Sequence, residues 1–145
     1  MNEKLPLSIR PIGRARGQRI EINKRWRKAL QGIEGFSHII VLFWLNKARK
    51  PEMMIHPKGI QKIPKIGLFA TRTPHRPNPI GATVVKLVRR YNNLLYVQGL
   101  DAWDGTPILD IKPYTKREAI KSYRIPRWVK PIDQQESDPL RKYAS

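Results

Sequence analysis

The chain contains no cysteine in its 145 residues. This absence excludes disulfides, thiolate metal ligands and a cysteine nucleophile. No stretch approaches the roughly 20 apolar residues of a membrane span, and the N-terminus lacks the apolar centre of a signal peptide. We therefore expect a cytoplasmic protein that has no membrane association.

Acidic residues are also scarce, because only 11 Asp and Glu stand against 29 Lys and Arg, a formal net charge of +18. Self-repulsion of this size is tolerable when the partner is a polyanion, and RNA is the natural candidate. The basic residues are spread along the chain, which is typical of contacts with a nucleic-acid backbone. A generally basic protein without such a partner is the alternative.

Several familiar site motifs are missing from the sequence. Neither the G-x-G-x-x-G nor the G-x-x-x-x-G-K-[ST] phosphate cradle occurs, and no G-x-S-x-G stands out. The three histidines lie far apart and have no cysteine beside them, so we expect no metal site.

The apolar patterns predict a mostly β protein. We expect strands over residues 7–16, 19–22, 37–45, 83–90, 94–99 and 107–114. The strand over 37–45 is apolar enough to be fully buried. The last three strands are joined by short turns, and Asp104-Gly105 is the strongest hairpin signal, which predicts an antiparallel meander. The fold class that follows is a mostly β domain that closes into an antiparallel barrel, with short helices and an extended C-terminal tail.

One helix is expected over residues 24–31. Asn23 is placed to be its N-cap and Gly32 ends it. Trp26, Ala29 and Leu30 are spaced as one narrow apolar face, which predicts that they lie in the core.

We expect one folded domain over residues 1–114 and a tail over 115–145 that docks on the barrel or on a second subunit. Trp128 is the reason for expecting docking, because a large aromatic side chain is unusual on a free tail. Residues 46–64 carry many lysines and prolines without clear periodicity, which predicts a long loop.

The first informative stretch is FATRTPHRPNPIG, residues 69–81. It follows a short apolar run, residues 66–69, that could end a buried strand. Three prolines within six residues exclude a helix and the middle of a sheet, so we expect a stiff loop. Its polar donors, Arg72, His75, Arg76 and Asn78, would cost little entropy to organise around an anionic or heteroaromatic ligand.

The second stretch carries three aspartates in ten residues, Asp101, Asp104 and Asp110. They could supply a general base or recognise hydroxyl and amino groups of a ligand. Alternatively, Asp104 serves a turn, and the other two pair with arginines such as Arg72 or Arg76.

Together, FATRTPHRPNPIG and the later GLDAWDGTPILDIKPY resemble the TrmO family, also called TsaA-like proteins. The upstream run GIEGFSHIIVLFW is similar to that family as well, and the resemblance covers roughly residues 9–114. It implies a single-sheeted antiparallel β-barrel, usually a homodimer, that binds S-adenosylmethionine. It also implies a tRNA substrate, methylated on N6 of threonylcarbamoyladenosine at position 37, beside the anticodon.

The resemblance also implies roles for particular residues. The donor would lie between the two stretches, and the residues expected to bind it are Arg72, His75, Arg76, Asn78, Asp104, Gly105 and Thr106. The substrate-binding residues are expected to be Arg14, Arg16, Lys112 and Tyr114. The acylated nitrogen must lose a proton, and the candidate acceptors are Asp101, Asp110 and His75.

One departure from the family concerns the segment after the first strand. Many members of that family carry a longer segment with a proline-arginine-glutamine element near the substrate, whereas here only residues 14–19 lie between the opening strand and Glu21. The donor-binding half therefore matches better than the substrate-binding half. The alternatives are a basic RNA-binding module that lost catalysis and, less in keeping with the charge, a methyltransferase for a small molecule.

Overall fold

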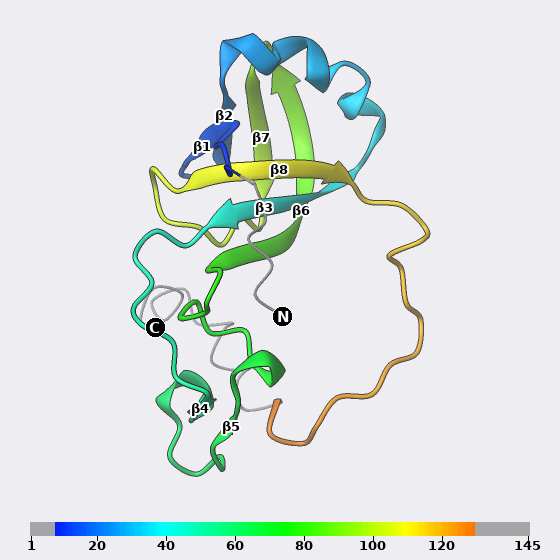
Figure 1. The fold of residues 1–145 in the computed structure, drawn as a ribbon. Coiled ribbons are helices and arrows are strands. Elements are labelled where there is room, and N and C mark those ends of the chain that lie inside the picture. Colours follow the sequence, from blue (N-terminus) through cyan, green and yellow to red (C-terminus); the bar gives the residue numbers. More distant parts are fainter. Residues whose placement is uncertain (1–7, 130–145) are drawn as a thin grey trace. The chain divides into compact units, whose positions relative to one another are not determined.

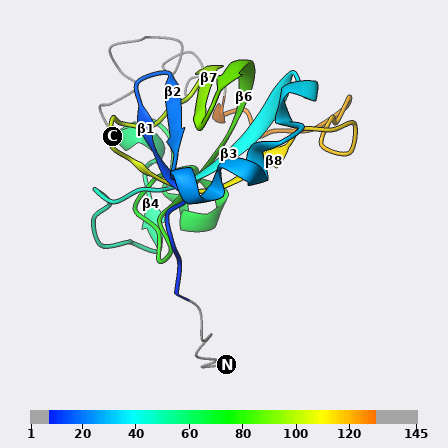
Figure 2. The same ribbon diagram turned by 90° about the horizontal axis from the view of Figure 1, so that it is seen from above.

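The computed structural model describes residues 8–129, and six strands form a closed barrel (Figure 1; Figure 2). Their order around the barrel is β1-β2-β7-β6-β3-β8, and β8 closes the ring by pairing antiparallel with β1. The strands are β1 (Gly13–Arg16), β2 (Arg19–Ile22), β3 (His38–Trp44), β6 (Ile80–Tyr91), β7 (Leu94–Gln98) and β8 (Pro107–Pro113). The predicted mostly β barrel is confirmed. Strand β1 begins later than expected, two residues after Pro11, which has no N–H to donate.

The predicted meander of the last three strands is wrong. Strand β7 pairs with β6 and β2, whereas β8 pairs with β3 and β1. Asp104-Gly105 therefore does not make a hairpin between β7 and β8. The reason is that this turn bonds to β1: Gly105 N–H donates to the Ala15 carbonyl at 2.7 Å, and Ala15 N–H donates to that of Thr106 at 2.9 Å.

The core lies inside the barrel and is filled by the inward-facing residues of the strands. On β3, Ile39, Val41 and Phe43 are buried, while the residues between them are half-buried. The expectation of a fully buried strand is thus half right, because a barrel strand turns one face inward and the other outward.

Gly13 occupies a position where two strands approach closely. A Cβ at this position would meet the Glu21 carbonyl oxygen and lie 2.9 Å from the Ile22 Cα. Glycine is therefore required here because there is no room for a side chain. A glycine within a strand can indicate a bulge, but Gly13 pairs regularly with Ile22.

The predicted helix is a 3₁₀ helix, η1 (Lys24–Leu30), which lies over the end of the barrel where β6 ends (Figure 1). The predicted apolar face is wrong in part. A 3₁₀ helix has three residues per turn, so Trp26 and Ala29 share one face, which is exposed, while Leu30 lies on another and is buried. Asn23 makes no side-chain capping hydrogen bond, and a second short helix, η2 (Ile33–Gly35), begins after Gly32.

Arg90, on strand β6, forms hydrogen bonds with both η1 and η2. Its Nη1 donates to the Leu30 carbonyl at 3.3 Å and to the Glu34 carboxylate at 2.8 Å, which makes an ion pair. The backbone N–H of Glu34, together with this bond from Arg90, holds the pKa of the Glu34 carboxyl below its usual range.

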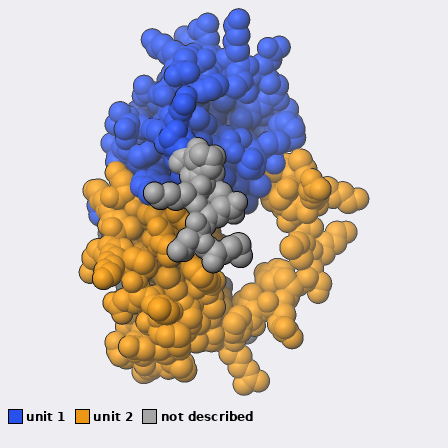
Figure 3. Space-filling model, in the orientation of Figure 1, with its two compact units in different colours: residues 1–44, 82–113 blue, residues 45–81, 114–145 orange. Residues whose placement is uncertain are grey.

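The segment between β3 and β6 forms part of a second compact unit, residues 45–81 and 114–145, distinct from the barrel unit, residues 1–44 and 82–113 (Figure 3). It contains a two-stranded sheet, β4 (Met54–Ile55) with β5 (Ile66–Gly67), and the 3₁₀ turns η3 (Pro57–Gly59) and η4 (Leu68–Ala70). The run expected to end a buried strand is thus half-buried at β5 and continues as η4, where Phe69 is exposed. The tail domain over 115–145 stays a prediction, and its residues 130–145 lie outside the described part; Trp128 is half-buried.

None of the helices in residues 8–129 has the length and apolar character needed to cross a bilayer.

Candidate functional site

The proline-containing loop, residues 71–79, is held together by short-range hydrogen bonds. Arg76 is its main clamp, because its Nη1 donates to the carbonyls of Thr71 at 2.8 Å and Thr73 at 3.2 Å. The same guanidinium lies 5.8 Å from the centre of the Phe69 ring. Arg72 and Asn78 are exposed on this loop, so the predicted donors lie on an ordered backbone.

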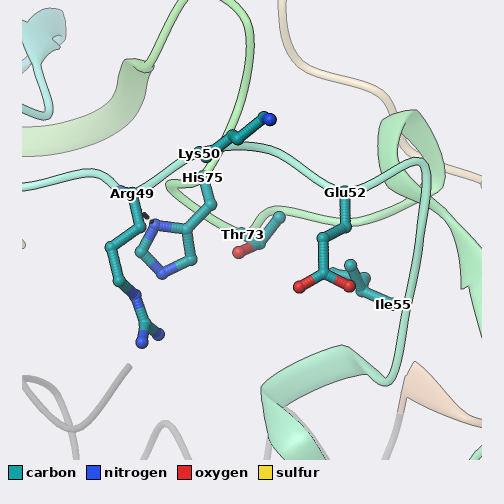
Figure 4. A pocket seen from close by; sticks show the side chains of 6 residues that line it. All are labelled: Arg49, Lys50, Glu52, Ile55, Thr73 and His75. Atoms are coloured by element: carbon teal, nitrogen blue, oxygen red, sulfur yellow. Dashed lines mark hydrogen bonds between the residues drawn. The ribbon is translucent and has the colours of Figure 1, made fainter.

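His75 is half-buried and contacts the segment that follows β3. The backbone N–H of Arg49 donates to His75 Nδ1 at 2.8 Å (Figure 4). A neutral imidazole that accepts at Nδ1 carries its proton on Nε2. Burial lowers the pKa of His75, and the nearby Arg49 charge lowers it further, so both favour the neutral ring.

A cavity of about 230 Å³ lies beside His75 (Figure 4). It is lined by Arg49, Lys50, Glu52, Ile55, Thr73 and His75. The long loop of the sequence therefore contributes four residues to a cavity that it shares with the proline-containing loop.

The aspartate-containing stretch belongs to the barrel unit, and its first turn is tied to the β1–β2 hairpin. Asp104 Oδ1 accepts the Gly17 N–H at 3.0 Å, and Arg14 Nη1 donates to the Gly105 carbonyl at 3.0 Å. Thr106 is the buried polar residue of this part of the chain. Asp104 thus makes the turn contact that was one of its two expected roles, and Arg14 lies against the turn expected to bind the donor.

The other two aspartates differ in their surroundings. Asp110 Oδ2 lies 3.0 Å from Lys112 Nζ, and its Oδ1 accepts the Ile111 N–H at 2.8 Å. The expected pairing of Asp110 with Arg72 or Arg76 is therefore replaced by a pair within β8, where residues two apart share a face. Asp101 is exposed, and within residues 8–129 its carboxylate forms no ion pair.

The remaining predicted substrate residues lie at the barrel surface or beyond its last strand. Arg16 is exposed on β1, and its Nε lies 3.9 Å from the Glu21 carboxylate. An ion pair this long and this exposed contributes little to the stability of the fold. Lys112 is exposed, and Tyr114, directly after β8, is half-buried. In the described residues, no group of three His, Cys, Asp or Glu side chains could hold a metal ion.

Residues 3–118 match the family described as the N-terminal domain of tRNA-methyltransferase O. The chain belongs to the TrmO N-terminal domain family. A "Probable S-adenosyl-L-methionine-binding protein" of Methanothermobacter thermautotrophicus is 46% identical over 95 residues, 66% of this chain and 67% of that protein. One of the same description from Archaeoglobus fulgidus is 48% identical over 96 residues, 66% of this chain but only 26% of that relative.

Among solved structures, a crystal structure of TrmO from P. aeruginosa superposes with a TM-score of 0.72 at 30% identity, covering 88% of this chain and 64% of that one. The chain therefore spans between about a quarter and two thirds of the length of these relatives. The family expected from the sequence motifs is confirmed, and so is its fold.

Within this TrmO domain, the two motif segments lie in different compact units. The proline-containing loop brings His75 and Thr73 to the cavity, whereas the aspartate-containing stretch is fixed to the β1–β2 hairpin. The placement of the donor between the two segments, and the catalytic, donor-binding and substrate-binding assignments, stay predictions.

Sequence reasoning missed one residue that positions the second motif of the TrmO domain. Gln18, in the β1–β2 turn, accepts the N–H groups of Gly99 and Leu100 through Oε1, at 3.1 and 3.2 Å. Its Nε2 donates to the Leu100 carbonyl at 3.0 Å. Gln18 therefore fixes the backbone immediately before Asp101, and nothing in the local sequence indicates this, because its partners lie about 80 positions away.

Proposed function

We propose that this protein is an S-adenosylmethionine-dependent methyltransferase that acts on N6 of threonylcarbamoyladenosine at position 37 of tRNA. The observation that carries the proposal is the match over residues 3–118 to the N-terminal domain of tRNA-methyltransferase O, which includes both motif segments. The names of the relatives support the donor, since several are S-adenosyl-L-methionine-binding proteins and one from Pseudomonas aeruginosa is a putative methyltransferase.

The described residues fit a donor of this kind. When bound, the donor supplies a methyl group on a positively charged sulfur, which is already activated for transfer. The protein chiefly has to align the two reactants and exclude water. Arg72, Asn78 and the half-buried His75, on a loop held by Arg76, offer polar contacts at little entropic cost.

The proton on N6 must leave as the new carbon–nitrogen bond forms. We assign its acceptance to Asp101. Its carboxylate is exposed and has no ion-pair partner in the described residues, and Gln18 holds the backbone before it. The two other candidates are already engaged: Asp110 pairs with Lys112, and His75 accepts a hydrogen bond at Nδ1.

Two observations support tRNA as the partner: the net charge of +18 and the cluster of positive charges on helix η1. Helix η1 presents four exposed cations, Lys24, Arg25, Arg27 and Lys28, and its first turn has no acid. Arg25 also lies 4.9 Å from the ring centre of the exposed Trp26. Cations interleaved with an exposed aromatic ring suit phosphates and unstacked bases. A homodimer and a cytoplasmic location remain parts of this proposal.

The test is calorimetric titration of the full chain with S-adenosylmethionine, followed by methylation of tRNA from cells that lack the modification. We expect binding, and transfer of one methyl group to the modified adenosine. Asn78→Ala is expected to abolish donor binding and turnover while leaving most RNA affinity, because phosphate contacts are spread over many cations.

A basic RNA-binding module without catalysis is the second candidate, and the net charge of +18 favours it. RNA binding without any donor binding, in the presence or absence of tRNA, would establish that function instead. Loss of RNA affinity in Asn78→Ala would assign the loop to RNA contact.

A further inference from the structure

The cavity beside His75 is built from two segments that are fixed to each other. Besides the hydrogen bond from Arg49 N–H to His75 Nδ1, β4 pairs with β5 through Met54↔Gly67. The Leu68 N–H donates to the Met53 carbonyl at 2.8 Å. The two segments that carry the lining residues are therefore joined by backbone hydrogen bonds within one compact unit.

Charges of both signs face this cavity. Arg49 and His75 lie together on one side, Glu52 lies with Ile55 on the other, and Thr73 stands between them (Figure 4). Glu52 is one of only 11 acids in the chain. Within residues 8–129 its carboxylate forms no ion pair with the cations around it.

We propose that this cavity binds the α-amino and α-carboxylate groups of the methionyl end of the methyl donor. Arg49 and the Nε2–H of His75 would bind the carboxylate, and Glu52 the ammonium group. This inference rests on the proposed function and extends its donor site to Arg49 and Glu52.

The size of the cavity fits one end of the donor. Pockets that enclose a drug-sized ligand measure roughly 300–1,000 Å³, and this one measures about 230 Å³. It is therefore suited to an amino acid group, with the nucleoside outside it.

The protonation state of His75 agrees with this role. Because Nδ1 accepts the Arg49 N–H, the neutral ring presents Nε2–H as a donor, and burial lowers the pKa, which keeps the ring neutral. A neutral donor beside Arg49 can bind a carboxylate without placing a second charge next to the guanidinium.

Two carboxylates take part in the proposed reaction, one on the methionyl end of the donor and one on the threonyl group of the modified adenosine. Glu52 indicates which of them this cavity binds. The threonyl group of the modified adenosine has a carboxylate, but its nitrogen is acylated and carries no positive charge. The methionyl end has both charges. An acid on one side of the cavity and an arginine on the other therefore match the methyl donor better than the modified base.

The test uses two thioether nucleosides that differ in the amino acid group. S-adenosylhomocysteine has it and 5′-methylthioadenosine lacks it. Calorimetry with Glu52→Gln should show S-adenosylhomocysteine binding weakened about tenfold, the loss of one charge-assisted contact, with 5′-methylthioadenosine unchanged. Arg49→Gln should behave alike, because the hydrogen bond to His75 comes from the Arg49 backbone.

Glu118→Gln, the same substitution outside the cavity lining, is the control and should leave both affinities unchanged. Equal losses for both nucleosides in Glu52→Gln, or no loss, would overturn this inference while leaving the proposed function intact. L-Methionine alone binding as tightly as S-adenosylhomocysteine would also overturn it, in favour of a free amino acid site. No binding of any nucleoside by the unmodified chain would overturn the proposed function together with this site.

Discussion

At the scale of single residues, Asp101 is the side chain whose role is most sharply testable. Asp101→Asn keeps the size of the side chain and removes the proton acceptor. We expect kcat to fall by about 10²–10⁴-fold, while the Kd for the donor stays unchanged. Steady-state rates with modified tRNA and calorimetry with the donor measure the two quantities.

Asp110→Asn is the matched control for this prediction. Its carboxylate is paired with Lys112, so we expect a smaller loss of kcat. If Asp110→Asn lowers kcat more than Asp101→Asn does, the proton acceptor is Asp110 and not Asp101.

Gly13 gives a second prediction at the residue scale. In Gly13→Ala the new methyl group would meet the Glu21 carbonyl oxygen, so strands β1 and β2 must move apart. We expect a loss of about 1–3 kcal/mol in the free energy of unfolding, the usual cost of overpacking. Urea denaturation followed by circular dichroism measures it.

Gly35→Ala is the control, because a Cβ there meets no atom within 4 Å and its φ is not positive. A loss in Gly35→Ala as large as that in Gly13→Ala would show that the close approach of β1 and β2 is not the cause.

The sequence indicated the proline-containing loop because its polar donors are consecutive and its prolines exclude regular structure. It did not indicate Gln18, Arg49 or Glu52. Gln18 works through carbonyl and N–H groups about 80 positions away, and Arg49 through its backbone on a histidine 26 positions away. Contacts of that separation depend on barrel closure and loop packing, which no local pattern records.

At the scale of elements, the link between η2 and β6 should respond to pH. The pKa of Glu34 is lowered in the folded protein by backbone hydrogen bonding and by Arg90. Its contribution to stability is therefore fully present above the unfolded carboxyl value of about 4.3, and is lost as pH falls through the lower folded value.

Glu34→Gln should accordingly be less stable than the unmodified chain at pH 7, and the two stabilities should converge as pH falls below about 4.3. Urea midpoints at pH 7, 5 and 3 measure this convergence. A difference that stays constant over the three values would mean that the Glu34–Arg90 pair does not couple folding to protonation.

The six barrel strands were predictable, because apolar alternation reflects which face of each strand turns inward, whereas β4 lies in the segment expected to be a loop. Their pairing was not. The Asp104-Gly105 turn has the sequence of a hairpin, yet its backbone bonds to β1, so β8 closes the barrel instead of returning along β7. Helix η1 shows the same limit, because a run of four cations around one tryptophan does not reveal whether three or 3.6 residues complete a turn.

At the scale of the whole molecule, the charge predicts a steep salt dependence of RNA binding. Each phosphate contact contributes about 0.7–0.9 to the slope of log K against log salt concentration. Replacing Lys24 and Lys28 of η1 by alanine should therefore lower the magnitude of this slope by about 1.4–1.8. Fluorescence anisotropy with an anticodon stem-loop, from 50 to 200 mM salt, would measure it.

The double variant Lys62→Ala with Lys65→Ala removes the same charge from exposed positions of the second unit. If both double variants change the slope equally, net charge alone explains binding, and η1 is not a preferred contact.

The segment between β3 and β6, residues 45–79, is inserted between two neighbouring barrel strands, and this has a consequence for how proteins of this family diversify. These two strands are neighbours in the barrel, and directly after β3 the Leu45 N–H donates to the Pro79 carbonyl at 2.7 Å, just before β6 begins. The two ends of this segment are thus already joined by a hydrogen bond, and lengthening the segment costs little chain entropy. A chimera that carries another relative's residues between these positions would keep the barrel's strand register while exchanging the ligand contacts.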